Sequence, residues 1–141
     1  MDALCQGIES LWAKGATAES KKHAIKALEA VVPSLEQAVK TPNEENRRAM
    51  SVGAYYAGRA IDISKTTGPH AFSYHLTDKY NVPHGEAVGM MMEAFIQTNY
   101  SALDEDLLTP IHKIFRTNSK EAWVESVLSI KRNTSQASRI D

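Results

Sequence analysis

Apolar residues recur at intervals of three and four along nearly the whole chain, which is the spacing of one face of an α-helix. No run of four to eight residues shows the clean alternation and β-branched enrichment of a half-buried strand. The pattern therefore predicts an all-α fold, a helical bundle of about six to seven helices. The expected helices cover residues 2–13, 17–38, 44–64, 85–100, 105–116 and 120–130, with a further short helix after Gly68-Pro69.

Capping and helix-breaking residues set the expected boundaries. Thr17 precedes the second apolar repeat, where its hydroxyl can accept a hydrogen bond from a free backbone N–H at a helix start. Pro33 kinks or divides this second segment, since proline lacks the N–H of a helical hydrogen bond. Residues 41–43, Thr-Pro-Asn, mark a turn and the cap of the next helix. That next helix holds four small residues that let another backbone approach closely, namely Gly53, Ala54, Ala57 and Gly58.

The composition favours a single domain. The chain has 141 residues, of which 43% are hydrophobic and 23% charged, and this is enough to bury one core. Residues 1–132 are expected to form a helical metal-binding domain, and the polar residues 133–141 a flexible tail. The helical pattern starts at Asp2 without a lead-in segment, so we expect the chain to begin in the middle of a larger fold.

Charge and cysteine content argue against several partners and compartments. The formal net charge is −1 and opposite charges are mixed along the chain, which argues against nucleic acid or a membrane surface as a partner. The single cysteine cannot form an internal disulfide, and the start of the chain shows no secretion leader or membrane span. A cytoplasmic location is the simplest expectation.

Three of the five histidines, His70, His75 and His84, fall within one short segment. His70 lies early in one expected helix and His84 at the start of the next, so a short antiparallel connection can bring both imidazoles to one point. Asp2 and Gln6, one turn apart on one helix face, can add oxygen donors. Imidazole together with a hard oxygen donor is a ligand set for a divalent metal.

Each of these residues also has an ordinary structural interpretation. Histidines at helix ends often act as caps or as hydrogen-bonded core residues, and Asp2 can complement a helix N-terminus. The methionines at 90–92 are best read as core filler. His23 and His112 lie on polar helical stretches, and the sequence assigns them no role.

Three segments within residues 1–100 together resemble one enzyme family. They are Asp2-Ala-Leu-Cys-Gln-Gly-Ile-Glu-Ser-Leu-Trp, Lys65-Thr-Thr-Gly-Pro-His-Ala-Phe-Ser-Tyr and Val82-Pro-His-Gly-Glu-Ala-Val. Their order and the interval between His70 and His84 are similar to those of the iron-containing alcohol dehydrogenase family. The first two segments look most like the phosphonoacetaldehyde reductase branch, while the third also resembles dehydroquinate synthase.

The resemblance implies an all-α domain like the C-terminal domain of these enzymes. Family members pair it with an N-terminal nucleotide-binding domain, which is absent from this chain, and carry a metal in the cleft between the two. The family pattern places the metal ligands at Asp2, Gln6, His70 and His84. Gln6 departs from the commoner histidine, and its neutral amide is a weaker ligand than imidazole. The implied cofactor is Fe2+ or Zn2+, although Ni2+ also suits these donors.

The implied reaction interconverts a small alcohol and aldehyde with NAD(P), and the metal polarises the substrate carbonyl as hydride arrives. Lys65 is then expected to hold an anionic substrate group such as a phosphonate, unless it is an ordinary solvated lysine. The family commonly has a histidine one turn after His70, and this chain has Tyr74 there. Tyr74 is the candidate catalytic proton relay, unless that role is lost. The neighbouring His75 points about 100° away on a helix.

Three hypotheses of function remain open. No glycine-rich phosphate loop opens a helix after a strand, so the first is a truncated oxidoreductase that is inactive alone and uses NAD(P) only with the missing domain. The second is a catalytically silent helical module that binds a partner, or forms a homodimer, through the bare face around Asp2, Gln6 and residues 70–84. The third is a dehydroquinate synthase-like fragment.

Overall fold

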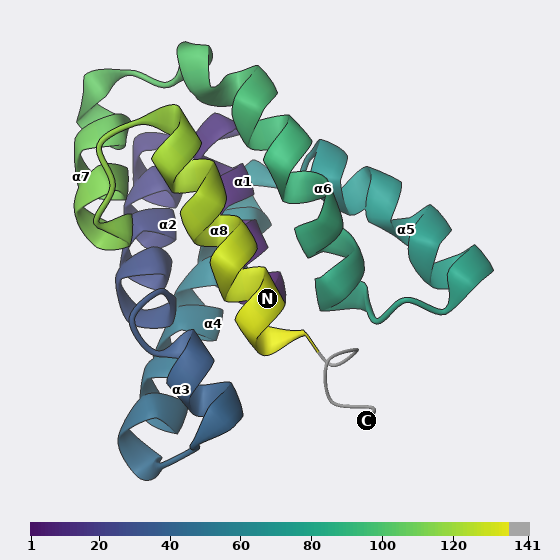
Figure 1. The fold of residues 1–141 in the computed structure, drawn as a ribbon. Helices are drawn as coiled ribbons and strands as arrows, with labels where there is room; N and C mark the ends of the chain where they lie inside the picture. The colour runs from purple at the N-terminus through teal and green to yellow at the C-terminus, as the bar shows by residue number, and fades with distance from the viewer. Residues whose placement is uncertain (136–141) are drawn as a thin grey trace.

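The computed structural model describes residues 1–135, and this part of the chain is built from helices without a strand, as predicted (Figure 1). The helices are α1 (Asp2–Trp12), α2 (Ala18–Val31), α3 (Leu35–Lys40), α4 (Glu44–Ser64), α5 (Gly68–Tyr80), α6 (His84–Asn99), the 3-10 turn η1 (Tyr100–Ala102), α7 (Glu105–Phe115) and α8 (Lys120–Thr134). Pro33 divides the second predicted helix into α2 and α3. Of the predicted tail, residues 133 and 134 belong to α8, and residues 136–141 lie outside the described residues.

The predicted caps form reciprocal hydrogen bonds. The Ser20 N–H donates to Thr17 Oγ1 over 3.1 Å, and the Thr17 N–H donates to Ser20 Oγ over 2.8 Å. Asn43 and Asn46 make the same pair of bonds at the start of α4, each 2.9 Å long. Because these bonds satisfy N–H groups that a helix start leaves free, both helices begin where the sequence predicts.

Helix α1 lies at the centre of the core and packs against α2, α4 and α6. Side chains on most of its surface are buried, including Leu4, Cys5, Ile8 and Leu11. Burial of these apolar side chains is the main force that stabilises the helical bundle. The start of α1, with Asp2 and Gln6, is only partly covered, so polar groups there can face both the core and the solvent.

Only part of the small-residue face on α4 contacts another helix. Gly53, Ala57 and Ala60 share one face and are buried against neighbouring helices, whereas Ala54 and Gly58 are exposed. A Cβ on Gly53 would lie 2.3 Å from Cγ2 of Val31 on α2, so this glycine permits the close approach. The prediction for Ala54 and Gly58 was wrong because each lies about 100° around the helix from the buried stripe.

Helices α5 and α6 form an antiparallel pair along one side of the molecule, joined by a short turn at residues 81–83 (Figure 1). Asn81 ends α5 in the left-handed conformation, with φ 55° and ψ 28°. This turn places the start of α6 beside α5, and α6 in turn packs on α1. No helix among residues 1–135 has the length and apolar character needed to cross a membrane.

Candidate metal centre

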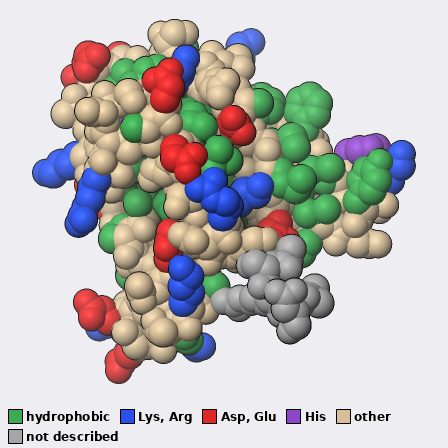
Figure 2. Space-filling view, viewed as in Figure 1, with side chains coloured by type: hydrophobic (Ala, Val, Ile, Leu, Met, Phe, Trp, Pro, Cys, Tyr) green, Lys and Arg blue, Asp and Glu red, His purple; other side chains and the backbone are tan. Residues whose placement is uncertain are grey.

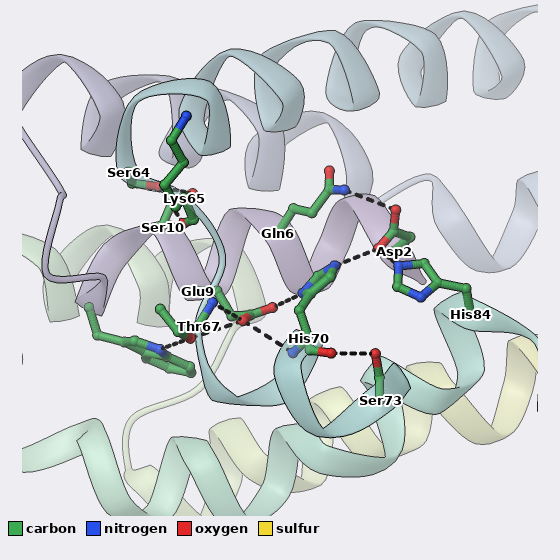
Figure 3. Close-up of polar contacts among 11 residues, drawn as sticks. Asp2, Gln6, Glu9, Ser10, Ser64, Lys65, Thr67, His70, Ser73 and His84 are labelled. Carbon is green, nitrogen blue, oxygen red and sulfur yellow. Dashed lines mark hydrogen bonds and ion pairs between the residues drawn. The ribbon is translucent and has the colours of Figure 1, made fainter. Parts of the chain in front are cut away.

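The starts of three helices meet at one point of the molecule (Figure 3). Asp2 is the first residue of α1, His70 lies in the first turn of α5, and His84 is the first residue of α6. One ligand atom from each residue lies within 4.8 Å of the other two. The structure therefore brings together three of the four ligand positions predicted from the sequence, from segments that are far apart along the chain.

The spacing of these atoms suits a divalent metal. Asp2 Oδ1 lies 3.0 Å from His70 Nε2 and 3.4 Å from His84 Nε2. Ligand atoms at bond lengths of about 2.1 Å stand about 3.0 to 3.4 Å apart around one ion. The side chain of His70 is 4% exposed, while those of Asp2 and His84 are 40% and 41% exposed. His70 thus lies on the buried side of the group, while Asp2 and His84 lie on a side that is open to solvent. A catalytic metal site needs such an open side for its substrate.

Gln6 stands one turn after Asp2 on the same helix face, as predicted. Its amide nitrogen donates to Asp2 Oδ2 over 2.9 Å, so its oxygen points away from Asp2 (Figure 3). In this orientation Gln6 holds the carboxylate of Asp2 in place. A rotation of the Gln6 amide by 180° would place its oxygen where its nitrogen now lies, and that oxygen could act as a metal ligand.

Glu9 is part of the site, and the sequence interpretation missed it. It lies on the same face of α1 as Asp2 and Gln6, and its side chain is fully buried. Its Oε2 makes a short contact with Nδ1 of His70, and its Oε1 accepts hydrogen bonds from the backbone N–H and the hydroxyl of Thr67 over 2.8 and 2.9 Å. The sequence feature that could have revealed Glu9 is its spacing from Asp2 and Gln6, because the three residues form a polar stripe on an otherwise apolar helix.

Asp2 and His70 shift each other's protonation. Burial opposes a charge on His70, but the hydrogen bonds and negative charges of Asp2 and Glu9 outweigh it and raise the pKa of His70 to about 9. Burial likewise raises the pKa of Asp2, but the hydrogen bond from His70 and the nearby positive charges lower it overall. Without a metal, the positive imidazolium and the negative Asp2 therefore stabilise one another.

The remaining predicted site residues lie at different places. The ring of Tyr74 is 60% exposed and stacks beside His84, with the ring centres 6.2 Å apart and the planes inclined by 11°. Lys65 follows α4, its Nζ donates to the carbonyl of Asp62 over 2.8 Å, and its side chain points away from the metal-ligand group (Figure 3). His75 is exposed and contacts the ring of Tyr80 rather than the group.

An all-helical domain that brings an aspartate and two histidines together at its helix starts has the ligand types of a metal-binding domain. Residues 1–139 match the C-terminal part of the Fe-containing alcohol dehydrogenase family, and the chain belongs to that family. This membership favours the dehydrogenase over dehydroquinate synthase as the relative that the His84 segment resembles.

Curated and solved relatives agree with this assignment. The chain is 32% identical over 111 residues to phosphonoacetaldehyde reductase of Streptomyces viridochromogenes, a match that covers 78% of this chain and 28% of that protein. The structure of sulfoacetaldehyde reductase from Bifidobacterium kashiwanohense in complex with NAD+ superposes with a TM-score of 0.82 at 30% identity, over 95% of this chain and 36% of that one. A 1,3-propanediol oxidoreductase structure, at 22% identity and a TM-score of 0.85, shows the same fold. The chain spans about a third of the length of these relatives.

Proposed function

We propose that this chain is the metal-carrying helical domain of an NAD(P)-linked alcohol dehydrogenase or aldehyde reductase, and that it is inactive without a nucleotide-binding domain. The convergence of Asp2, His70 and His84 within 4.8 Å is the observation that carries this proposal. These residues come from the starts of three helices, and two imidazoles with a carboxylate form a ligand set that suits a divalent metal. Family membership supports the same conclusion.

The ligand set favours Fe2+ or Zn2+. Two imidazole nitrogens and one carboxylate oxygen leave room for a further ligand, from Gln6 or from a substrate oxygen. When bound, a divalent metal at this site acts as a Lewis acid on a carbonyl oxygen. The chain's own residues position that metal, because Glu9 and Gln6 fix the orientation of His70 and Asp2.

A small aldehyde that bears an acidic group is the substrate class that we propose. The names of two relatives, phosphonoacetaldehyde reductase and sulfoacetaldehyde reductase, denote aldehydes of this kind. Lys65 is the proposed residue for the acidic group, once its side chain leaves the carbonyl of Asp62. Tyr74 is the proposed proton donor or acceptor at the open side, since its ring lies beside His84.

Elemental analysis of the purified chain tests the proposal. The wild-type chain is expected to contain about one equivalent of iron or zinc, and the double variant His70→Ala, His84→Ala is expected to contain none. His75→Ala is the matched control, because His75 lies on the same helix as His70 but outside the ligand group. Absence of metal in the wild type after incubation with Fe2+ or Zn2+, or equal content in wild type and double variant, would contradict the proposal.

A further inference from the structure

Glu9 uses both of its carboxylate oxygens although it is fully buried. Oε1 accepts two hydrogen bonds from Thr67, and Oε2 contacts Nδ1 of His70 (Figure 3). A buried carboxylate that lacked these partners would be strongly unfavourable. These contacts therefore connect α1 to the start of α5 at His70, the residue whose ring also faces Asp2.

The direction of each hydrogen bond in this network is determined. The backbone N–H of Thr67 can only donate, and the indole N–H of Trp12 can only donate, which it does to Thr67 Oγ1 over 2.9 Å. Because the Thr67 oxygen accepts from Trp12, the Thr67 hydroxyl directs its own hydrogen to Glu9 Oε1. Oε1 must consequently be an acceptor, with two donors aimed at it.

The same reasoning shows that Nδ1 of His70 carries a hydrogen. A carboxylate oxygen accepts hydrogen bonds, so Nδ1 of His70 carries a hydrogen where it meets Glu9 Oε2. We propose that Glu9 is a positioning residue that selects the Nδ1–H form of His70 and aims Nε2 at the metal position shared with Asp2 and His84. This inference rests on the proposed metal site. In many metal sites a carboxylate behind a ligand histidine fixes both its tautomer and its ring orientation.

Glu9 also has a purely structural role that must be separated from this one. Helix α5 has no capping bond from its own Thr67 side chain, and Glu9 Oε1 takes the Thr67 N–H and lies 3.5 Å from the His70 N–H. The carboxylate thus stabilises the start of α5. A test has to change the group that faces His70 while keeping the group that faces Thr67.

The variant Glu9→Gln meets this requirement. Its amide oxygen is expected to face Thr67, because two donors point there, and its NH2 group then faces Nδ1 of His70. In its neutral form, which is the form that binds a metal, the histidine must then accept at Nδ1 and keep its hydrogen on Nε2, the nitrogen that the metal needs. We expect Zn2+ affinity, measured by competition with a chelator at fixed pH, to fall about 10- to 100-fold.

Thr67→Val is the matched control. It removes the hydroxyl bond to Glu9 Oε1 and disturbs the same helix start, but it leaves the contact of Glu9 with His70 in place. We expect a lower Tm with Zn2+ affinity close to that of the wild type. Equal Zn2+ affinity in the wild type and Glu9→Gln, or an equal loss in Glu9→Gln and Thr67→Val, would overturn the inference.

Nitrogen-15 NMR of His70 in the metal-free chain, recorded at a pH high enough for the imidazole to be neutral, provides an independent readout. The wild type is expected to carry a hydrogen on Nδ1, and Glu9→Gln is expected to lack it. A wild-type Nδ1 without hydrogen overturns the inference even if Glu9→Gln does not fold. If the wild type binds no Zn2+, the proposed metal site fails, and the Nδ1 measurement still decides whether Glu9 selects the tautomer.

Discussion

Lys65 adopts a backbone conformation that glycine adopts far more readily, with φ 63° and ψ 171°. A non-glycine residue in this region costs roughly 1–3 kcal/mol, and such strain is often retained at functional positions. Lys65 N–H still donates to the Ile61 carbonyl over 2.8 Å, so the chain leaves α4 in a fixed direction toward Thr67 and His70. The strain is consistent with the role in binding acidic substrates that we propose for Lys65.

The variant Lys65→Gly separates the backbone strain at this position from the proposed role of the Lys65 side chain in binding acidic substrates. We expect it to raise the free energy of unfolding by about 1 kcal/mol, because glycine adopts this conformation without strain. Binding of methylphosphonate to the zinc-loaded chain, followed by phosphorus NMR, is expected to weaken about tenfold. Lys65→Ala is the matched control and should lose binding without the gain in stability. Unchanged methylphosphonate binding in both variants would remove Lys65 from the substrate site.

The raised pKa of His70 predicts how the stability of the metal-free chain depends on pH. The pKa is about 9 in the folded chain against an ordinary value of 6.5, so the folded state binds the proton more tightly. The stabilising contribution is complete below pH 6.5 and is lost as the pH rises through about 9. Urea unfolding of the metal-free chain should therefore show a fall in stability over this interval that is absent in His70→Gln. A wild-type curve that rises or runs parallel to the variant over this interval would contradict this account.

At the scale of single helices, the approach of α4 to α2 predicts opposite effects for two similar substitutions. Gly53→Ala places a Cβ 2.3 Å from Val31 Cγ2, and we expect it to destabilise the chain by about 1–3 kcal/mol. Gly58→Ala meets nothing within 4 Å and should stabilise the chain by about 0.5–1 kcal/mol through helix propensity. Chemical denaturation of both variants measures the difference, and effects of the same sign would show that α4 packs differently.

Helix boundaries were the most predictable part of this chain. The range Glu44–Ser64 of α4 agrees with the approximate range that was predicted, because Asn43 is a cap and the small residues at Gly53 and Ala57 form a helical stripe. Helix α5 was expected to be short but has 13 residues. It buries only Pro69, His70 and Ser73, so it carries almost no apolar pattern that a sequence analysis could detect.

The site was predictable only in part. The clustering of His70 and His84, together with the family resemblance, indicated the ligand group that the structure brings together. The burial of Glu9 depends on Thr67 and His70, which lie about sixty residues further along the chain, so no local pattern reveals it. The backbone strain at Lys65 is likewise set by the meeting of helices rather than by the residue itself.

At the scale of the whole molecule, apolar side chains gather over α5 and α6 (Figure 2). Phe72, Tyr74, Tyr80 and Met90 are 63%, 60%, 60% and 46% exposed. A surface of this kind favours association, so we expect a concentration-dependent dimer in size-exclusion chromatography. The double variant Phe72→Ser, Tyr80→Ser should be a monomer. Tyr55→Ser is the control, since Tyr55 is 58% exposed on α4. A wild-type chain that stays monomeric at all concentrations would refute the expectation.

The central claim is that the starts of α1, α5 and α6 together hold a divalent metal. X-ray absorption spectroscopy of the zinc-loaded chain tests it most directly, because the spectrum reports the ligand atoms. We expect one zinc per chain with nitrogen and oxygen ligands only, including two imidazoles, since burial raises the pKa of Cys5 and keeps its thiol protonated. A sulfur ligand, or fewer than two imidazoles, would show that the metal lies elsewhere and would contradict the account.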